Sequence, residues 1–138
     1  MAERSLVDYM LDGMKGKWSK PVKHADAYTA GVADVSAYIL PAGNIWIETK
    51  ARDTWPKRAN TRVMLGLDDL QKDFLLCRRG WLFARIQREY LLWDYNYAYW
   101  CIDAQDATQG KLRANVTKTW KNSVDWDEFA AIVSKCLA

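Results

Sequence analysis

Apolar and polar residues alternate along two neighbouring segments, and this alternation constrains the fold more than any other feature of the sequence. Residues 33–40 read ADVSAYIL and residues 45–50 read IWIETK, with apolar side chains recurring at every second position. This period is that of a β-strand with one buried face. The residues between them, PAGN at 41–44, have the composition of a turn. The pattern predicts an antiparallel hairpin that places Glu48 and Lys50 on one face of its second strand.

Other periodic segments predict helices and strands around this hairpin. Apolar residues at helical spacing, bounded by glycine, aspartate or arginine, are typical of amphipathic helices. Helices are expected over residues 3–15, from 67 or 68 to 79 and from 125 to about 137, strands over 81–86 and 90–93, loops over 17–23 and 51–66, and an extended piece over 22–25. Residues 95–122 show no clear pattern. This order predicts an α/β domain built on a small mixed sheet.

The helical spacing also predicts buried faces and helix ends. The predicted helix that ends near residue 79 should bury Leu70, Phe74 and Cys77, and Gly80 should terminate it. The last helix should bury Phe129, Ile132, Val133 and Cys136.

Composition narrows the class of protein. The 138 residues suit one domain, or one domain with a short appendage, and the net charge of +3 is mild. The three cysteines are widely spaced and there is one histidine, so neither a zinc site nor a disulfide framework is indicated. We find no apolar stretch long enough to span a membrane and no apolar signal core, and we expect a reduced, cytoplasmic protein.

Three charged residues of the hairpin carry the chemistry. Asp34 begins the first strand, and a hairpin closed at 41–44 places it opposite residue 50 or 51, near Glu48 and Lys50. Two carboxylates and the main-chain carbonyl of Thr49 are ligands of the type that Mg²⁺ prefers. A lysine beside them would orient or help deprotonate a water, and the cation would stabilise charge on a phosphodiester under attack.

The segments GVAD at 31–34 and WIETKA at 46–51 resemble the signature of the PD-(D/E)XK nuclease superfamily. The spacing of 14 residues between Asp34 and Glu48 lies within the family's range. Residues 67–92, with Gln71 on a helix that leads into a strand and a hairpin, are similar to small phage Holliday-junction-resolving and virus-type replication-repair endonucleases. Ala33 replaces the proline that usually precedes the aspartate.

The resemblance implies a restriction-endonuclease-like core, in which a small mixed sheet is flanked by helices. It would occupy residues 1–94, with a helical or mixed C-terminal extension over 95–138 that packs on the core or forms a dimer contact. It further implies an endonuclease that uses Mg²⁺, or Mn²⁺, to cut branched DNA as a homodimer in the cytoplasm of a phage-infected host. Asp34, Glu48 and Lys50 would be catalytic, with Asp34, Glu48 and the Thr49 carbonyl holding the metal.

Several other residues have a functional and a structural interpretation. Glu3, Asp26, His24 and Gln71 are possible further members of the site, while His24 also suits a structural role and Gln71 a solvated helix face. The basic side chains Arg52, Lys57, Arg58, Arg62 and Lys72 would bind DNA phosphates. A solvated loop and helix face is the structural alternative.

Three further functions stay open at this stage. One is an endonuclease that acts on linear duplex, flap or single-stranded DNA. Another is a non-catalytic DNA-binding protein on the same fold. The third is a protein-interaction module, which the tail rich in Trp and Tyr would suit. Metal dependence of DNA binding would separate a nuclease site from an interaction module.

Overall fold

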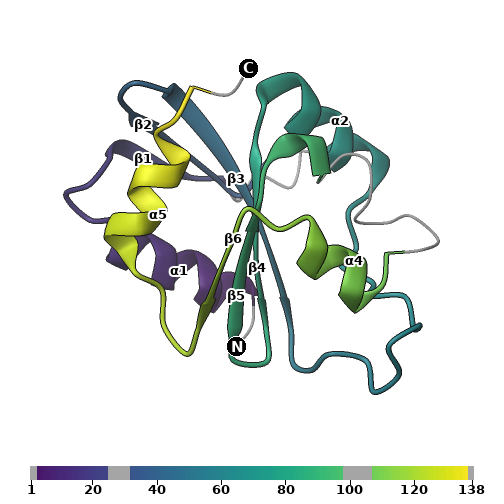
Figure 1. The fold of residues 1–138 in the computed structure, drawn as a ribbon. Helices are drawn as coiled ribbons and strands as arrows, with labels where there is room; N and C mark the ends of the chain where they lie inside the picture. Colours follow the sequence, from purple (N-terminus) through teal and green to yellow (C-terminus); the bar gives the residue numbers. More distant parts are fainter. Residues whose placement is uncertain (1–2, 25–31, 98–106, 137–138) are drawn as a thin grey trace.

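A six-stranded mixed sheet with helices on both faces forms the centre of the molecule (Figure 1). The computed structural model describes residues 3–24, 32–97 and 107–136. The strands lie in the order of the sequence: β1 (Ser19–Lys23), β2 (Val35–Ile39), β3 (Gly43–Arg52), β4 (Trp81–Ile86), β5 (Glu89–Trp93) and β6 (Lys118–Lys121). Neighbouring strands are antiparallel except β3 and β4, which are parallel. The predicted mixed α/β sheet is therefore confirmed.

The predicted hairpin forms, but its register differs from the expected one. Val35 pairs with Ile47, so Asp34 lies beside Glu48 rather than opposite residue 50 or 51. Pairing continues to Ile39 and Gly43, so the connection is shorter than the expected turn over residues 41–44. A shorter connection moves every partner along the strand and brings the two carboxyl-bearing residues together.

Helices α1 (Glu3–Gly13) and α5 (Trp126–Val133) cover one face of the sheet (Figure 1). Leu6 and Met10 of α1 and Phe129 of α5 pack into one apolar cluster with the buried residues of β2 and β3. Gly13 permits the close approach of the two helices, because a Cβ there would lie 2.0 Å from the Trp126 ring. The last helix ends before the expected boundary, so Cys136 is exposed and not part of the buried face.

Helices α2 (Asp69–Arg78) and α4 (Gln109–Ala114) cover the opposite face. The expected buried stripe of α2 is wrong at two of its three residues, since Leu70 is 56% exposed and Cys77 is exposed. Phe74 is half-buried against the apolar cluster of this face, and Leu75 is the buried residue. The helix has apolar residues on more than one side, so packing against the sheet decides its rotation.

Arg79, with φ 51°, takes the left-handed position that ends α2. Gly80 is needed instead for packing, since a Cβ there would lie 2.6 Å from the Leu75 side chain.

β1 overlaps the extended piece expected over residues 22–25 but begins within the expected loop, and β6 lies in a segment where no strand was predicted. β1 is exposed at all five positions and contains Pro21, and β6 is a short strand rich in lysine and threonine. Neither carries the alternation that marks a half-buried strand. β6 hydrogen-bonds to β5, and α5 follows it into the core.

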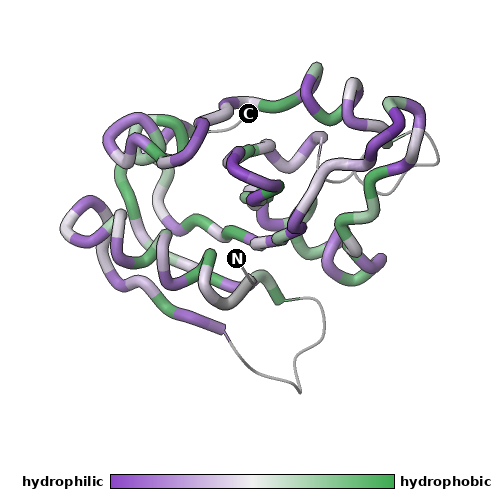
Figure 2. The backbone as a smooth tube through the Cα atoms, turned by 90° about the horizontal axis from the view of Figure 1, so that it is seen from below, coloured by the Kyte–Doolittle hydropathy of each residue, from purple (hydrophilic) through white to green (hydrophobic). Residues whose placement is uncertain are grey.

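Hydrophobic and hydrophilic residues are interspersed along the chain (Figure 2). No helix among the described residues has the length and apolar character needed to cross a membrane.

Candidate functional site

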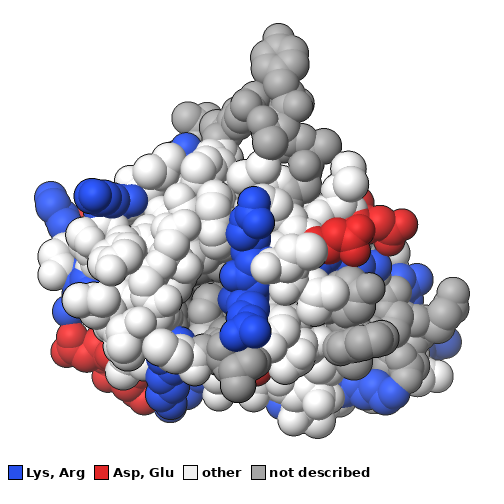
Figure 3. Space-filling model, turned by 90° about the horizontal axis from the view of Figure 1, so that it is seen from above, with Lys and Arg blue, Asp and Glu red and all other residues white. Residues whose placement is uncertain are grey.

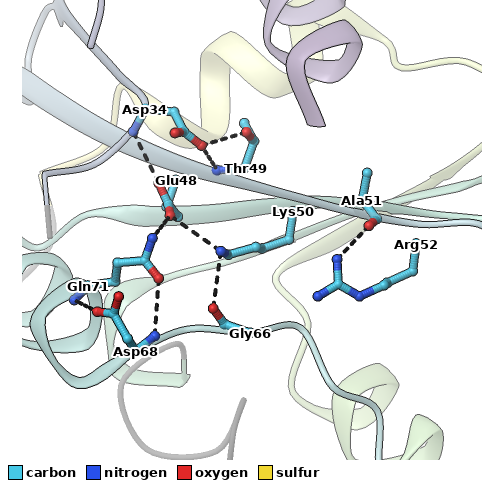
Figure 4. A network of polar contacts seen from close by, with 9 residues as sticks. All are labelled: Asp34, Glu48, Thr49, Lys50, Ala51, Arg52, Gly66, Asp68 and Gln71. Atoms are coloured by element: carbon cyan, nitrogen blue, oxygen red, sulfur yellow. Dashed lines mark hydrogen bonds and ion pairs between the residues drawn. The ribbon is translucent and has the colours of Figure 1, made fainter. Parts of the chain in front are cut away.

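The candidate site lies where β2 begins, beside the middle of β3 (Figure 4). Glu48 and Lys50 project from β3 on the same face as Trp46, because alternate residues of a strand share a face. The side of the sheet that they occupy is covered by α2, and Glu48 is 2% and Lys50 8% exposed. Ionisable side chains are almost never this buried unless they are paired. The burial of Glu48 and Lys50 was not predictable from their alternation.

Hydrogen bonds connect Asp34 to both Glu48 and Thr49. The main-chain N–H of Asp34 donates to Oε1 of Glu48 at 3.1 Å. Oδ2 of Asp34 accepts from the main-chain N–H of Thr49 at 2.9 Å and from its Oγ1 at 2.7 Å. The two carboxyl groups therefore lie close together at the edge where β2 starts.

Lys50 extends from β3 between Glu48 and the segment that precedes α2. Its Nζ lies 3.8 Å from Oε2 of Glu48 and donates to the carbonyl of Gly66 at 3.2 Å. Gly66 has φ +78°, a conformation that favours glycine. The ammonium group is thus held beside the Glu48 carboxyl group by a contact with the main chain.

Gln71 connects the start of α2 to Glu48. Its Nε2 donates to Oε2 of Glu48 at 2.7 Å, and its Oε1 accepts from the N–H of Asp68 at 3.1 Å. Asp68 in turn accepts from the N–H of Gln71 at 2.8 Å, which completes a capping box at the helix N-terminus. One amide side chain therefore fixes both the helix end and the orientation of the carboxyl group.

Burial raises the pKa of Glu48 to about 9, and the neighbouring Asp34 carboxylate adds to this shift by charge repulsion and by a hydrogen bond. The Lys50 ammonium and the N–H of Asp34 oppose the shift. A raised carboxyl pKa with a specific charged partner is common at functional sites and is also found in structural ion-pair networks.

The donor set fits a hard divalent cation. Two adjacent carboxylates in a buried site repel each other, and a cation between them would remove both that repulsion and the cost of burying the Glu48 charge. The main-chain carbonyl of Thr49 faces the same edge as its N–H, toward Asp34. In the part of the chain that the structure describes, no group of three or more His, Cys, Asp or Glu side chains is placed to hold a metal.

The structure does not add His24, Glu3 or Asp26 to the cluster of Asp34, Glu48 and Lys50. His24 lies outside the cluster, with its ring stacked on Trp46 and its Nε2 2.8 Å from Oγ of Ser36. Its main-chain N–H donates to the carbonyl of Asp34 at 2.7 Å. It supports the main chain at Asp34. Glu3 begins α1, but its side chain is outside the described residues, as is the whole of Asp26.

The side chains predicted to bind DNA differ in their exposure and in the groups that they contact. Arg52 binds the loop after β3, donating from Nε to the carbonyl of Met64 at 2.8 Å. Lys57 and Arg58 are exposed, Arg62 is half-buried beside Thr108, and Lys72 lies 3.9 Å from Asp69. Of this set, Lys57 and Arg58 present the most accessible charge.

Two contributors, Asp68 and Gly66, were not predicted as part of the site. The spacing of Asp68 and Gln71 is that of a capping box, and this pattern could have identified the cap. No signal in the sequence relates Gly66 to Lys50, since their contact depends on how the loop returns.

A scan against models of protein families found no match to this chain, and a search of curated proteins found none either.

Proposed function

We propose that this chain is a metal-dependent DNA endonuclease of the PD-(D/E)XK type. The observation that carries the proposal is the buried cluster in which the Asp34 and Glu48 carboxyl groups adjoin each other and the Lys50 ammonium lies 3.8 Å from Glu48. A solvated strand face would leave these side chains exposed and contributing little. Burying them together has a substantial desolvation cost, which a catalytic role explains.

Each residue has a distinct task in this proposal. Asp34 and Glu48, both ionised, would hold the cation together with the Thr49 carbonyl. When bound, the cation would supply Lewis-acid stabilisation of charge on the phosphodiester. Lys50, held by the Gly66 carbonyl, would orient the attacking water and assist its deprotonation. Gln71 would keep the Glu48 carboxylate in position.

The topology supports the proposal without deciding it. The two acidic residues come from adjacent antiparallel strands, the Glu-Thr-Lys segment lies in the second of them, and the helix bearing Gln71 leads into β4 and the β4–β5 hairpin. This is the arrangement that the restriction-endonuclease-like resemblance implies.

The resemblance alone suggests the substrate. We propose branched DNA, with a homodimer delivering the two symmetric cuts that a four-way junction requires. Linear duplex, flap and single-stranded DNA are the competing substrates, and a DNA-binding protein without activity is the competing function. A pure binding protein has no need for paired carboxylates beside a polyanion, because these repel DNA unless a cation lies between them.

The test is cleavage of labelled four-way junction, linear duplex and single-stranded DNA in Mg²⁺ and in EDTA. Lys50→Ala should abolish cutting, while Lys121→Ala, which removes an exposed lysine on β6, should leave it unchanged. Paired nicks on the junction alone would support a resolving enzyme, and equal cutting of linear DNA would shift the substrate. Metal-independent binding without cutting of any substrate would overturn the enzyme proposal.

A further inference from the structure

A cationic pocket of about 280 Å³ lies at the start of β3, beside the end of β2 and away from the candidate site. It is bounded by the C-terminal end of α2, the residues after α5 and the β2–β3 connection. Arg78, Arg79 and Lys135 line it, together with Asn44, and none of its described lining residues is acidic. Seen from this end, lysine and arginine side chains form a column between uncharged surfaces (Figure 3).

Hydrogen bonds hold the walls of this pocket in place. The N–H of Ala42 donates to the carbonyl of Ser134 at 2.9 Å, and Sγ of Cys136 lies 3.4 Å from the carbonyl of Pro41. On the other side, the N–H of Gly80 donates to the carbonyl of Leu75 at 2.8 Å. The β2–β3 connection and the residues after α5 are thus joined by hydrogen bonds although they are distant in the sequence, and the third wall is the hydrogen-bonded end of α2.

Arg79 occupies a conformation that glycine would adopt more readily. It has φ 51° and ψ 45°, the left-handed position at which helices commonly end on glycine. A residue with a side chain is sterically disfavoured there. The chain keeps a cation at this position, on the wall of the pocket.

We propose that this pocket binds a backbone phosphate of the DNA substrate, away from the bond that is cut. The inference rests on the proposed function and adds a second contact to it. Guanidinium groups match the geometry of phosphate oxygens, and a concave cationic site without acidic lining residues favours an anion over a neutral ligand.

The separation of the two sites suggests which phosphate would bind. Ile45 in the pocket and Glu48 are three residues apart on β3, or about 10 Å along the strand. Gln71 and Arg78 are seven residues apart on α2, which again corresponds to about 10 Å. Both paths separate the pocket from the candidate site by about 10 Å, so the bound phosphate would lie within a few nucleotides of the cut.

The alternative is that these cations serve only to complement the helix ends. Arg78 is in the last turn of α2 and Lys135 follows the end of α5, positions at which positive charge is favourable. The two explanations differ in what substitution changes: DNA affinity in one case, thermal stability alone in the other.

The experiment measures the Kd for the preferred DNA in Mg²⁺ and the Tm of each protein, using the Lys50→Ala chain to prevent cutting. Arg78→Gln and Arg79→Gly are compared with Arg88→Gln, which removes the same charge from the β4–β5 turn. Arg79→Gly should preserve the fold, because glycine suits its conformation. We expect each pocket variant to raise Kd roughly tenfold and to reduce the salt slope by about 1, with little effect of Arg88→Gln.

A substrate series locates the phosphate. Neutral methylphosphonates placed one at a time should weaken binding most at one position within a few nucleotides of the mapped cut, and Arg79→Gly should remove that penalty. Equal Kd values for the pocket variants and Arg88→Gln would overturn the proposal, and a lower Tm for Arg78→Gln would then assign the cations to the helix ends. If the pocket variants weaken DNA binding but the chain with Lys50 unsubstituted cuts no DNA in Mg²⁺, the result would support the pocket and reject the endonuclease. Absence of any DNA binding would reject both.

Discussion

Gln71 on the first turn of α2 donates from Nε2 to Oε2 of Glu48, 23 residues earlier on β3, at 2.7 Å. Because the same amide accepts from the N–H of Asp68, the capping box of the helix and the orientation of the Glu48 carboxyl group depend on one side chain. A helix terminus is thereby coupled to the candidate metal site.

Removing the Gln71 amide should weaken Mg²⁺-dependent cleavage more than it lowers the stability of the fold. We expect Gln71→Ala to lower cleavage about 10- to 100-fold and to raise the Mg²⁺ concentration required, as is typical when a partner of a metal ligand is lost. Leu70→Ala, at an exposed neighbouring position of the same helix, is the matched control and should retain activity. Magnesium titrations of both variants would test this, and an unchanged requirement in Gln71→Ala would contradict it.

The raised pKa of Glu48 makes metal-free stability depend on pH. The folded state keeps a proton up to about pH 9, whereas the unfolded state loses it near its ordinary value of 4.5. The contribution of protonated Glu48 to stability is therefore complete below that lower value and is lost as pH rises toward 9, with a slope of at most about 1.4 kcal/mol per pH unit.

Urea unfolding in EDTA across this pH range would measure the effect as the difference between the unsubstituted chain and Glu48→Gln. The difference should favour Glu48→Gln increasingly as pH rises. A constant difference would show that Glu48 is already ionised at low pH in the folded state.

Stabilisation by bound divalent cations should increase with pH, opposite to the fall in stability expected without metal. Mg²⁺ or Mn²⁺ binds the ionised carboxylates, so it must displace the Glu48 proton, and its affinity should increase with pH. We expect saturating Mn²⁺ to raise Tm more at pH 8 than at pH 5.5, and Asp34→Asn to abolish most of the rise. Differential scanning fluorimetry with a Ca²⁺ control would measure it, and an equal rise in Asp34→Asn would place the ion elsewhere.

Gly66 should affect both the position of the Lys50 side chain, which its carbonyl holds, and the conformation of the loop. It has φ +78°, and a Cβ there would lie 3.2 Å from Nη2 of Arg52. We expect Gly66→Ala to lower the free energy of unfolding by about 1 kcal/mol and to reduce cleavage at least tenfold, because the carbonyl that holds Lys50 would shift. Gly16→Ala is the control: φ is +80° but a Cβ there meets nothing within 4 Å, so it should lose similar stability and keep its activity.

The rotation of α2 can be checked through its leucines. Leu75 is buried and Leu70 is exposed, so Leu75→Ala should lower the free energy of unfolding by about 2–5 kcal/mol and Leu70→Ala by less than about 0.5 kcal/mol. Denaturant unfolding of the two variants measures these losses. A larger loss for Leu70→Ala than for Leu75→Ala would show that Leu70 is buried, as the helical spacing predicts.

The amino-acid sequence by itself singled out Asp34, Glu48 and Lys50 as the candidate site, through their resemblance to a family signature. It also determined the central hairpin, helices α1, α2 and α5 and the β4–β5 pair. These depend on periods of two and 3.6 residues and on residues that favour turns and helix ends, which act within short segments.

Only the tertiary structure decided the details that join those residues into a site. The shorter hairpin connection set Asp34 beside Glu48, sheet packing rotated α2 so that Leu75 rather than Leu70 is buried, and the returning loop brought Gly66 to Lys50. The edge strands β1 and β6 likewise form by pairing with neighbours, without an apolar pattern of their own. Register, helix rotation and burial depend on contacts between distant segments, so no local pattern specifies them.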